Sequence, residues 1–129
     1  GEERALQYQR ATNNEFQQLY RIGQRDGIAF DSLVRAYDAR TIAADASQKI
    51  YNDRSLSADQ RRAALQELAQ TTRTQILSTL GPNAGPTYVE NSRWLRHIEG
   101  GGAITIMPDG NMAYRSPPPT SSTAPRKQP

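Results

Sequence analysis

Residues 56–82 read LSADQRRAALQELAQTTRTQILSTLGP, and this stretch decides the fold. It begins with a capping box, in which Ser57 caps a helix and Gln60 reaches back to the cap. Gly81 and Pro82 predict the end of that helix, because glycine accepts a left-handed cap and proline cannot continue the helical hydrogen bonds. Side chains at helical spacing between these signals predict its buried face: Leu65, Leu68, Ala69, Thr72, Ile76 and Leu80.

The chain before this stretch carries aromatic and small residues seven positions apart. Such spacing favours a helical seam that faces another helix. Gly27, which follows a charged pair, is typical of a helix end. We therefore predict two helices, over residues 13–25 and 30–52, with one continuous helix as the alternative, and Thr12 as the cap of the first. The seam contains Phe16, Gly23, Phe30, Tyr37, Ala44 and Tyr51.

Downstream of Pro82, turn and cap signals predict one more helix. Residues 83–86 predict a short turn, and residues 87–90 (TYVE) predict a capping box at the start of the helix. The three glycines at 100–102 end this helix and form a flexible joint. Its apolar face contains Trp94, Leu95 and Ile98.

The C-terminal region predicts two strands followed by a tail. Residues 108–110 (PDG) are a turn signal between two short β-prone segments, 103–107 and 111–115. We therefore predict a β-hairpin. Residues 116–129 are rich in proline and contain no large apolar side chain, so we expect them to be disordered.

Together these elements predict a mainly α fold of three to four amphipathic helices, with a C-terminal β-hairpin and a disordered Pro-rich tail. We assign residues 1–99 to a helical domain, 100–115 to the hairpin on its glycine linker, and 116–129 to the tail. Hydrophobic residues make up 36% of the 129 positions, and the mean hydropathy is −0.79. Because a chain this poor in apolar residues has difficulty burying the seam on all sides, we expect a homodimer.

The composition excludes several kinds of site. The chain has no cysteine, which removes disulfides, thiolate zinc sites and cysteine nucleophiles. No apolar run reaches the length of a membrane span, so we expect no transmembrane segment. A cysteine-free chain suits an oxidising bacterial compartment, although cytosolic proteins can lack cysteine too. The predicted location is therefore periplasmic or secreted, with the cytoplasm as the alternative.

The ionisable residues do not form a recognisable catalytic or metal-binding group. His97 is the single histidine and lies late in a predicted helix, where a positive imidazole interacts favourably with the helix dipole. Asp31, Asp38 and Asp45 are seven residues apart and are predicted to form a solvated row that nearby cations neutralise. We predict no catalytic residue, no metal ligand and no cofactor.

Binding to a protein partner is the function that we expect instead. The formal net charge is +3, but charges alternate in sign along the helices and no Lys/Arg stripe interleaves with aromatics, so we do not expect nucleic-acid binding. Aromatic residues at helical spacing are typical either of core packing or of a binding surface. The candidate partner-binding residues are Phe16, Tyr20, Phe30, Tyr37, Tyr51, Trp94, Arg126 and Lys127.

Residues 56–60 (LSADQ), followed by Arg61 and Arg62, resemble the LTxxQ segment of small helical periplasmic proteins, a family that includes stress chaperones and metal-stress sensors. Serine stands where the family has threonine, and the motif occurs once. The run from Leu80 to Leu95 is similar to a pattern in uncharacterised exported bacterial proteins. The resemblance implies antiparallel helices that form a curved dimer with a chaperone-like function.

The leading hypothesis is a non-enzymatic binding or scaffold protein of the bacterial cell envelope that acts through a helical surface. A periplasmic chaperone-like stress protein is the alternative that the resemblance implies. A small hydrolase that uses a carboxylate pair is the alternative from a different class.

Overall fold

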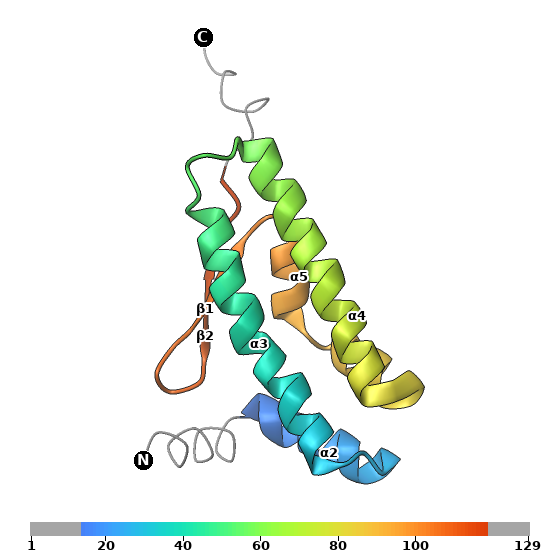
Figure 1. Cartoon of the computed structure of the whole chain (residues 1–129). Helices are drawn as coiled ribbons and strands as arrows, with labels where there is room; N and C mark the ends of the chain where they lie inside the picture. Colours follow the sequence, from blue (N-terminus) through green and yellow to red (C-terminus); the bar gives the residue numbers. More distant parts are fainter. Residues whose placement is uncertain (1–13, 119–129) are drawn as a thin grey trace.

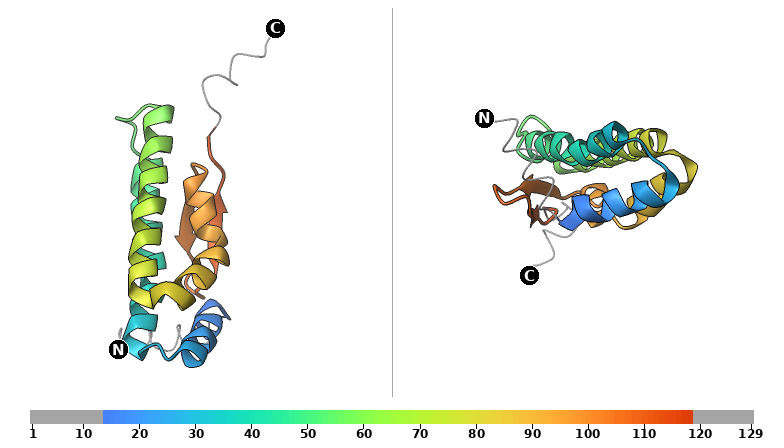
Figure 2. Two further views of the ribbon diagram at one scale, coloured as in Figure 1. Left: turned by 90° about the vertical axis from the view of Figure 1, so that its right-hand side faces the viewer. Right: turned by 90° about the horizontal axis from the view of Figure 1, so that it is seen from below.

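The structure of the protein, a computed structural model, describes residues 14–118. Its elements are α2 (Asn14–Asp26), α3 (Phe30–Tyr51), α4 (Ala58–Glu90), α5 (Arg93–Glu99), β1 (Ala103–Ile106) and β2 (Met112–Arg115). Figure 1 shows α3 and α4 antiparallel and side by side. In Figure 2, α5 and the hairpin form a second layer against them, and α2 lies at one end. The predicted mainly α fold with a C-terminal β-hairpin is confirmed. The predicted Thr12 cap and the tail beyond residue 118 lie outside the described residues.

The prediction of two helices in place of one long helix is confirmed, and two glycines explain the break. Gly27 has φ +71°, a conformation that L side chains rarely adopt, and its neighbour Ile28 donates its N–H to the Gly23 carbonyl at 2.9 Å. A Cβ on Gly23 would lie 2.6 Å from a methyl carbon of Leu33. The absence of that Cβ therefore lets α2 fold back tightly onto α3.

The predicted start of α4 is confirmed. Ser57 accepts a hydrogen bond from the Gln60 N–H, and the Gln60 side chain accepts one from the Ser57 N–H. The predicted face is buried in the order that helical spacing requires, except for Leu68, which is half-buried. The fully buried members are Leu65, Ala69, Thr72, Ile76 and Leu80.

The predicted interruption at Gly81 and Pro82 is present, but the predicted turn at 83–86 and the capping box at 87–90 are wrong. Gly81 does leave the helical conformation, with φ 89° and ψ 179°, but the chain re-enters a helix at once and continues to Glu90. Proline is favoured at the first position of a helix, because its fixed φ fits and its missing N–H would have no partner there. Pro82 therefore starts the second part of α4, and the bend brings this part toward α5 (Figure 2).

The actual break before α5 lies at Asn91 and Ser92. The Asn91 side chain donates to the Thr87 carbonyl at 3.0 Å, and the Ser92 hydroxyl donates to the Tyr88 carbonyl at 2.7 Å. These bonds satisfy carbonyls that the end of a helix leaves unpaired. Helix α5 then buries its predicted face against α4: Trp94, Leu95 and Ile98.

The β-hairpin shares the helical core. Strands β1 and β2 are antiparallel, and Ile104 pairs with Tyr114. Gly110 takes φ +90° in the turn, as the turn signal predicts. Ile104 is fully buried and donates its N–H to the hydroxyl of the buried Ser47 in α3 at 3.1 Å. In a two-stranded sheet, each strand has one edge without a partner strand. Ser47 thus accepts a hydrogen bond from a backbone N–H on the unpaired edge of β1.

Among the helices at residues 14–118, none is both long enough and apolar enough to cross a membrane.

Candidate functional site

His97 serves as a link between α5 and β2. Its Nε2 lies 2.6 Å from the Arg115 carbonyl oxygen, and its ring meets that of Tyr114 edge-on at a centroid distance of 4.9 Å. Because a carbonyl only accepts, Nε2 carries the proton in this arrangement. The half-buried imidazole therefore holds two elements together.

The predicted aspartate row does not gather into a metal site. Asp31 and Asp45 are exposed and Asp38 is half-buried, all on α3. Within the part of the chain that the structure describes, no three His, Cys, Asp or Glu side chains lie close enough together to hold a metal ion.

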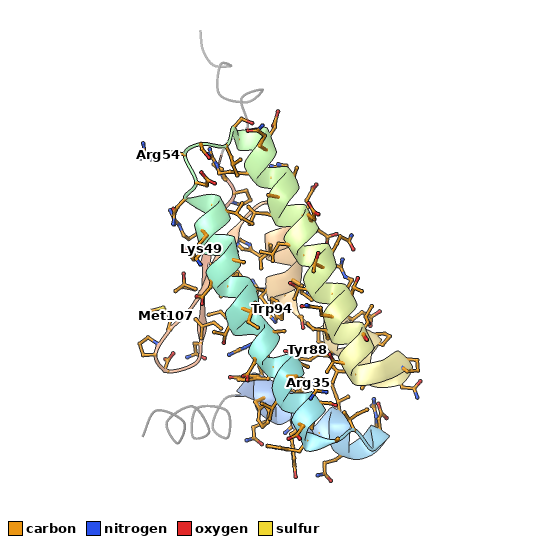
Figure 3. All side chains as sticks on the ribbon, viewed as in Figure 1. Arg35, Lys49, Arg54, Tyr88, Trp94 and Met107 are labelled. Atoms are coloured by element: carbon orange, nitrogen blue, oxygen red, sulfur yellow. The ribbon has the colours of Figure 1, made fainter. Side chains whose placement is uncertain are left out.

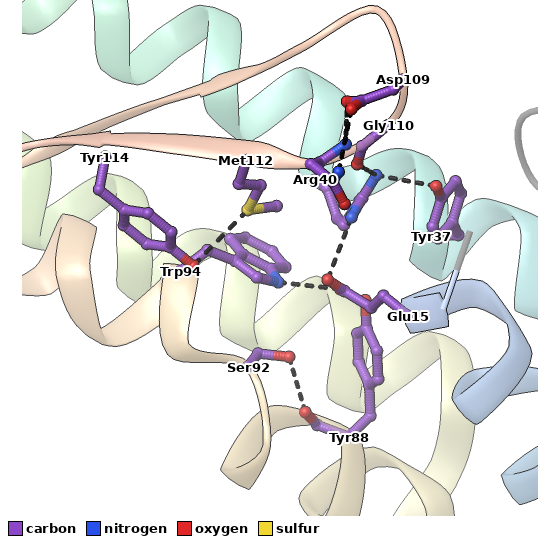
Figure 4. Close-up of polar contacts among 11 residues, drawn as sticks. Glu15, Tyr37, Arg40, Tyr88, Ser92, Trp94, Asp109, Gly110, Met112 and Tyr114 are labelled. Carbon is purple, nitrogen blue, oxygen red and sulfur yellow. Dashed lines mark hydrogen bonds and ion pairs between the residues drawn. The ribbon is translucent and has the colours of Figure 1, made fainter.

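A cluster of hydrogen-bonded polar side chains joins the helices, and the sequence did not reveal it. We call it the Glu15–Arg40 cluster; its members are Glu15, Tyr37, Arg40, Tyr88 and Trp94 (Figure 4). Arg40 donates from Nη1 to Glu15 Oε1 at 3.0 Å and from Nη2 to the Tyr37 hydroxyl at 2.8 Å. Tyr88 and Trp94 donate to Glu15 Oε2 at 2.6 and 3.1 Å.

The cluster connects the four described helices and the hairpin turn. Its side chains come from α2, α3, α4 and α5, and Arg40 Nη2 also lies 3.3 Å from the carbonyl oxygen of Gly110 in the hairpin turn. Arg40 is only 2% exposed, so its positive charge depends on these oxygens for stabilisation. The sequence carried one signal for it: an arginine stands among apolar residues on the buried face of α3.

An open pocket of about 480 Å³ lies beside the cluster. Glu15, Arg40 and Tyr88 form one wall, and Met112 and Tyr114 of the hairpin form another. Glu15 is the one carboxylate among its described lining residues. A hydrolase with a carboxylate pair requires two carboxylates facing the same substrate, and the lining residues within 14–118 provide one.

Tyr88 in the cluster makes the free energy of unfolding depend on pH in the alkaline range. Burial raises the pKa of the Tyr88 hydroxyl well above its usual value, and the neighbouring Glu15 carboxylate raises it further. In the unfolded chain the same phenol ionises near about pH 10. Between that pH and the higher folded pKa, the unfolded state binds fewer protons than the folded state, so stability falls as the pH rises.

We therefore expect the free energy of unfolding to fall by up to about 1.4 kcal/mol per pH unit above about pH 10 because of Tyr88. Urea titrations between about pH 8 and pH 11.5 measure this slope. Tyr88→Phe should flatten it, and Tyr20→Phe, a change at a phenol that is exposed in the single chain, should not when both are measured at a concentration at which the chain is monomeric. An unchanged slope in Tyr88→Phe would contradict the burial of this hydroxyl.

Two of the predicted partner-binding aromatics, Tyr20 and Phe30, are exposed next to each other. Phe30 is 55% exposed and Tyr20 38%, and their ring centroids are 6.4 Å apart in an edge-on arrangement. Phe16 packs beneath them, with its ring 6.1 Å from Phe30 and 5.1 Å from Tyr37. We call Tyr20 and Phe30 the aromatic pair; it lies where α2 folds back onto α3.

The structure places the other predicted residues elsewhere. Phe16, Tyr37 and Trp94 are buried, and Figure 3 shows Trp94 between the helices. Tyr51 is the last residue of α3, so it lies at the opposite end of this helix from the aromatic pair (Figure 1). Its hydroxyl donates to the Ser116 carbonyl at 2.7 Å. Arg126 and Lys127 lie outside the described residues.

Comparisons with protein-family models, with curated proteins and with solved structures found no match to this chain.

Proposed function

We propose that the protein is a non-enzymatic binding or scaffold protein of the bacterial cell envelope, and that the aromatic pair is its binding surface. The observation that carries the proposal is the exposure of two large rings side by side on helices α2 and α3. Exposed aromatic rings gain stability when a partner removes them from water, at roughly 25 cal/mol per Å² of apolar surface.

The base of the aromatic pair is well anchored. Phe30 rests on Phe16, Phe16 rests on Tyr37, and the Tyr37 hydroxyl accepts a hydrogen bond from Arg40 in the Glu15–Arg40 cluster. Rings held in this way lose little side-chain freedom when a partner covers them. Aromatic side chains, phenylalanine and tyrosine among them, are enriched at protein interfaces relative to the rest of the surface.

We propose that the partner is a second copy of the chain. In a two-fold symmetric contact the same patch appears on both subunits, so Tyr20 and Phe30 each contribute twice. The low apolar content of the chain supports this choice, because two copies together bury rings that one copy leaves exposed. A cell-envelope location rests on the absence of cysteine and on the resemblance of residues 56–60 to periplasmic proteins.

Sedimentation equilibrium across micromolar concentrations tests the proposal. We expect a reversible dimer, and we expect Phe30→Ser to raise its dissociation constant by about tenfold or more, since the loss of a central aromatic anchor costs at least about 2 kcal/mol. Ile42→Ser is the matched control, because Ile42 is 69% exposed on the same helix but lies outside the aromatic pair.

Thermal unfolding of both variants checks that the fold is intact. A wild-type chain that stays monomeric at every concentration would contradict the proposal. An equal weakening of the dimer by Phe30→Ser and Ile42→Ser would also contradict it, because the contact would then not be centred on the aromatic pair.

A further inference from the structure

At the end of the molecule opposite the aromatic pair, three arginines line an open pocket of about 530 Å³. They are Arg54, in the loop between α3 and α4; Arg61, in the first turns of α4; and Arg115, the last residue of β2. Residues up to 61 positions apart are brought together here because the hairpin returns along α3. Within residues 14–118, no aspartate or glutamate lines this pocket.

Hydrogen bonds hold one edge of the Arg115 guanidinium group in place. Its Nη1 lies 3.1 Å from Asn52 Oδ1 and 3.4 Å from Gln48 Oε1. Its Cζ lies 4.2 Å from the ring centroid of Tyr51, a cation–π contact that fixes the plane of the group. Its Nη2 and Nε make no hydrogen bond with any residue in the range 14–118.

Arg61 is oriented in a similar way. Its Nη1 donates to the backbone carbonyls of Asp53 and Leu56 at 3.0 and 2.6 Å. Its remaining donors also have no partner among residues 14–118. The hydrogen-bond acceptors of both guanidinium groups are thus neutral. The nearest described counter-charge is the Asp53 carboxylate, whose pKa is lowered by hydrogen bonds from Ser55 and, to a lesser extent, by the charge of Arg61.

The charges around the pocket are predominantly positive. Arg62 lines the adjoining pocket together with Arg61, against the carboxylate of Asp53. The Asp53 carboxylate accepts hydrogen bonds from the N–H and hydroxyl of Ser55 at 2.9 and 2.6 Å. The described ion pairs lie elsewhere, between Arg25 and Asp26, Arg40 and Glu15, and Arg73 and Glu99.

We propose that this pocket binds a compact phosphate-type oxyanion through Arg54, Arg61 and Arg115. The planar fork of an arginine matches two oxygens of a phosphate, and fixed guanidinium groups lose little freedom when they bind one. The phosphate belongs either to a free small molecule or to a lipid headgroup, and the chemistry of recognition is the same. The pocket shares no residue with the aromatic pair, so this inference stands apart from the proposed function.

Isothermal titration calorimetry with inorganic pyrophosphate, at low ionic strength, tests the proposal on the full chain. We expect saturable binding that weakens steeply with added salt. Arg54→Gln and Arg115→Gln should each weaken binding by about tenfold, as expected for the loss of a charge-assisted contact. Arg21→Gln, on the exposed surface of α2, removes the same charge at the other end and should leave binding unchanged.

Arg115→Gln also loses the contact with Tyr51, so its thermal unfolding is measured alongside. Arg54 makes no hydrogen bond or ion pair with the described residues and extends outward from its loop (Figure 3), so Arg54→Gln tests the site without a structural side effect.

A second arm uses flotation with vesicles of phosphatidylcholine, with and without phosphatidylglycerol. Pyrophosphate binding that depends on Arg54 identifies a free oxyanion as a ligand, and flotation that depends on phosphatidylglycerol and Arg54 identifies a headgroup. The absence of binding in both arms, or binding that Arg21→Gln weakens as much as Arg54→Gln, would overturn the proposal.

Discussion

Glu15→Leu should lower the free energy of unfolding by about 3 kcal/mol, because it leaves the buried guanidinium of Arg40 without its counter-charge. An arginine cannot escape this cost by losing its proton. The value is at the lower end of the range for buried pairs, since the Glu15 side chain is 26% exposed whereas that of Arg40 is 2% exposed. Urea denaturation at pH 7 measures the loss.

The double variant Glu15→Leu with Arg40→Met separates a buried charge from simple loss of contacts. Replacing both members of a buried ion pair with apolar residues is often close to neutral, so the double variant should recover much of the stability that Glu15→Leu loses. Arg25→Gln, which breaks the exposed pair with Asp26, is the control and should leave stability nearly unchanged. A double variant as unstable as the sum of its single variants would mean that the two side chains do not interact.

Leu65→Ala should cost about 2–5 kcal/mol, because Leu65 is 1% exposed and belongs to the hydrophobic core. Leu68→Ala removes the same atoms from a half-buried position on the same helix and should cost clearly less. Both variants keep the helix propensity of α4 nearly constant, so the difference between them reports burial. Equal losses in urea denaturation would show that the orientation of α4 is wrong.

The sequence predicts the helix ends and turns of this fold correctly where neighbouring residues alone determine them. The capping box at Ser57, the break at Gly27 and the turn at Gly110 depend on hydrogen bonds or dihedral angles within a few residues. The pair Gly81 and Pro82 shows the limit. The same two residues end one helix and begin the next, and tertiary contacts decide whether a turn follows.

The candidate sites depend on contacts that sequence spacing does not encode. Glu15 and Trp94 are 79 positions apart, and Tyr51 and Ser116 are 65 apart. The seven-residue spacing treats Phe16 and Phe30 as equivalent, yet one is buried and the other exposed. The break at Gly27 accounts for this difference, because it turns α2 back and removes the two rings from a common helix face.

Site-specific photo-crosslinking at position 30 tests the central claim most directly, namely that the aromatic pair is the binding surface. In one variant p-benzoyl-phenylalanine replaces Phe30, and in a matched variant it replaces the more exposed Ile42. We predict that irradiation at micromolar concentration gives a covalent dimer from the first variant and little or none from the second. Equal yields from both positions, or no dimer from position 30, would contradict the account.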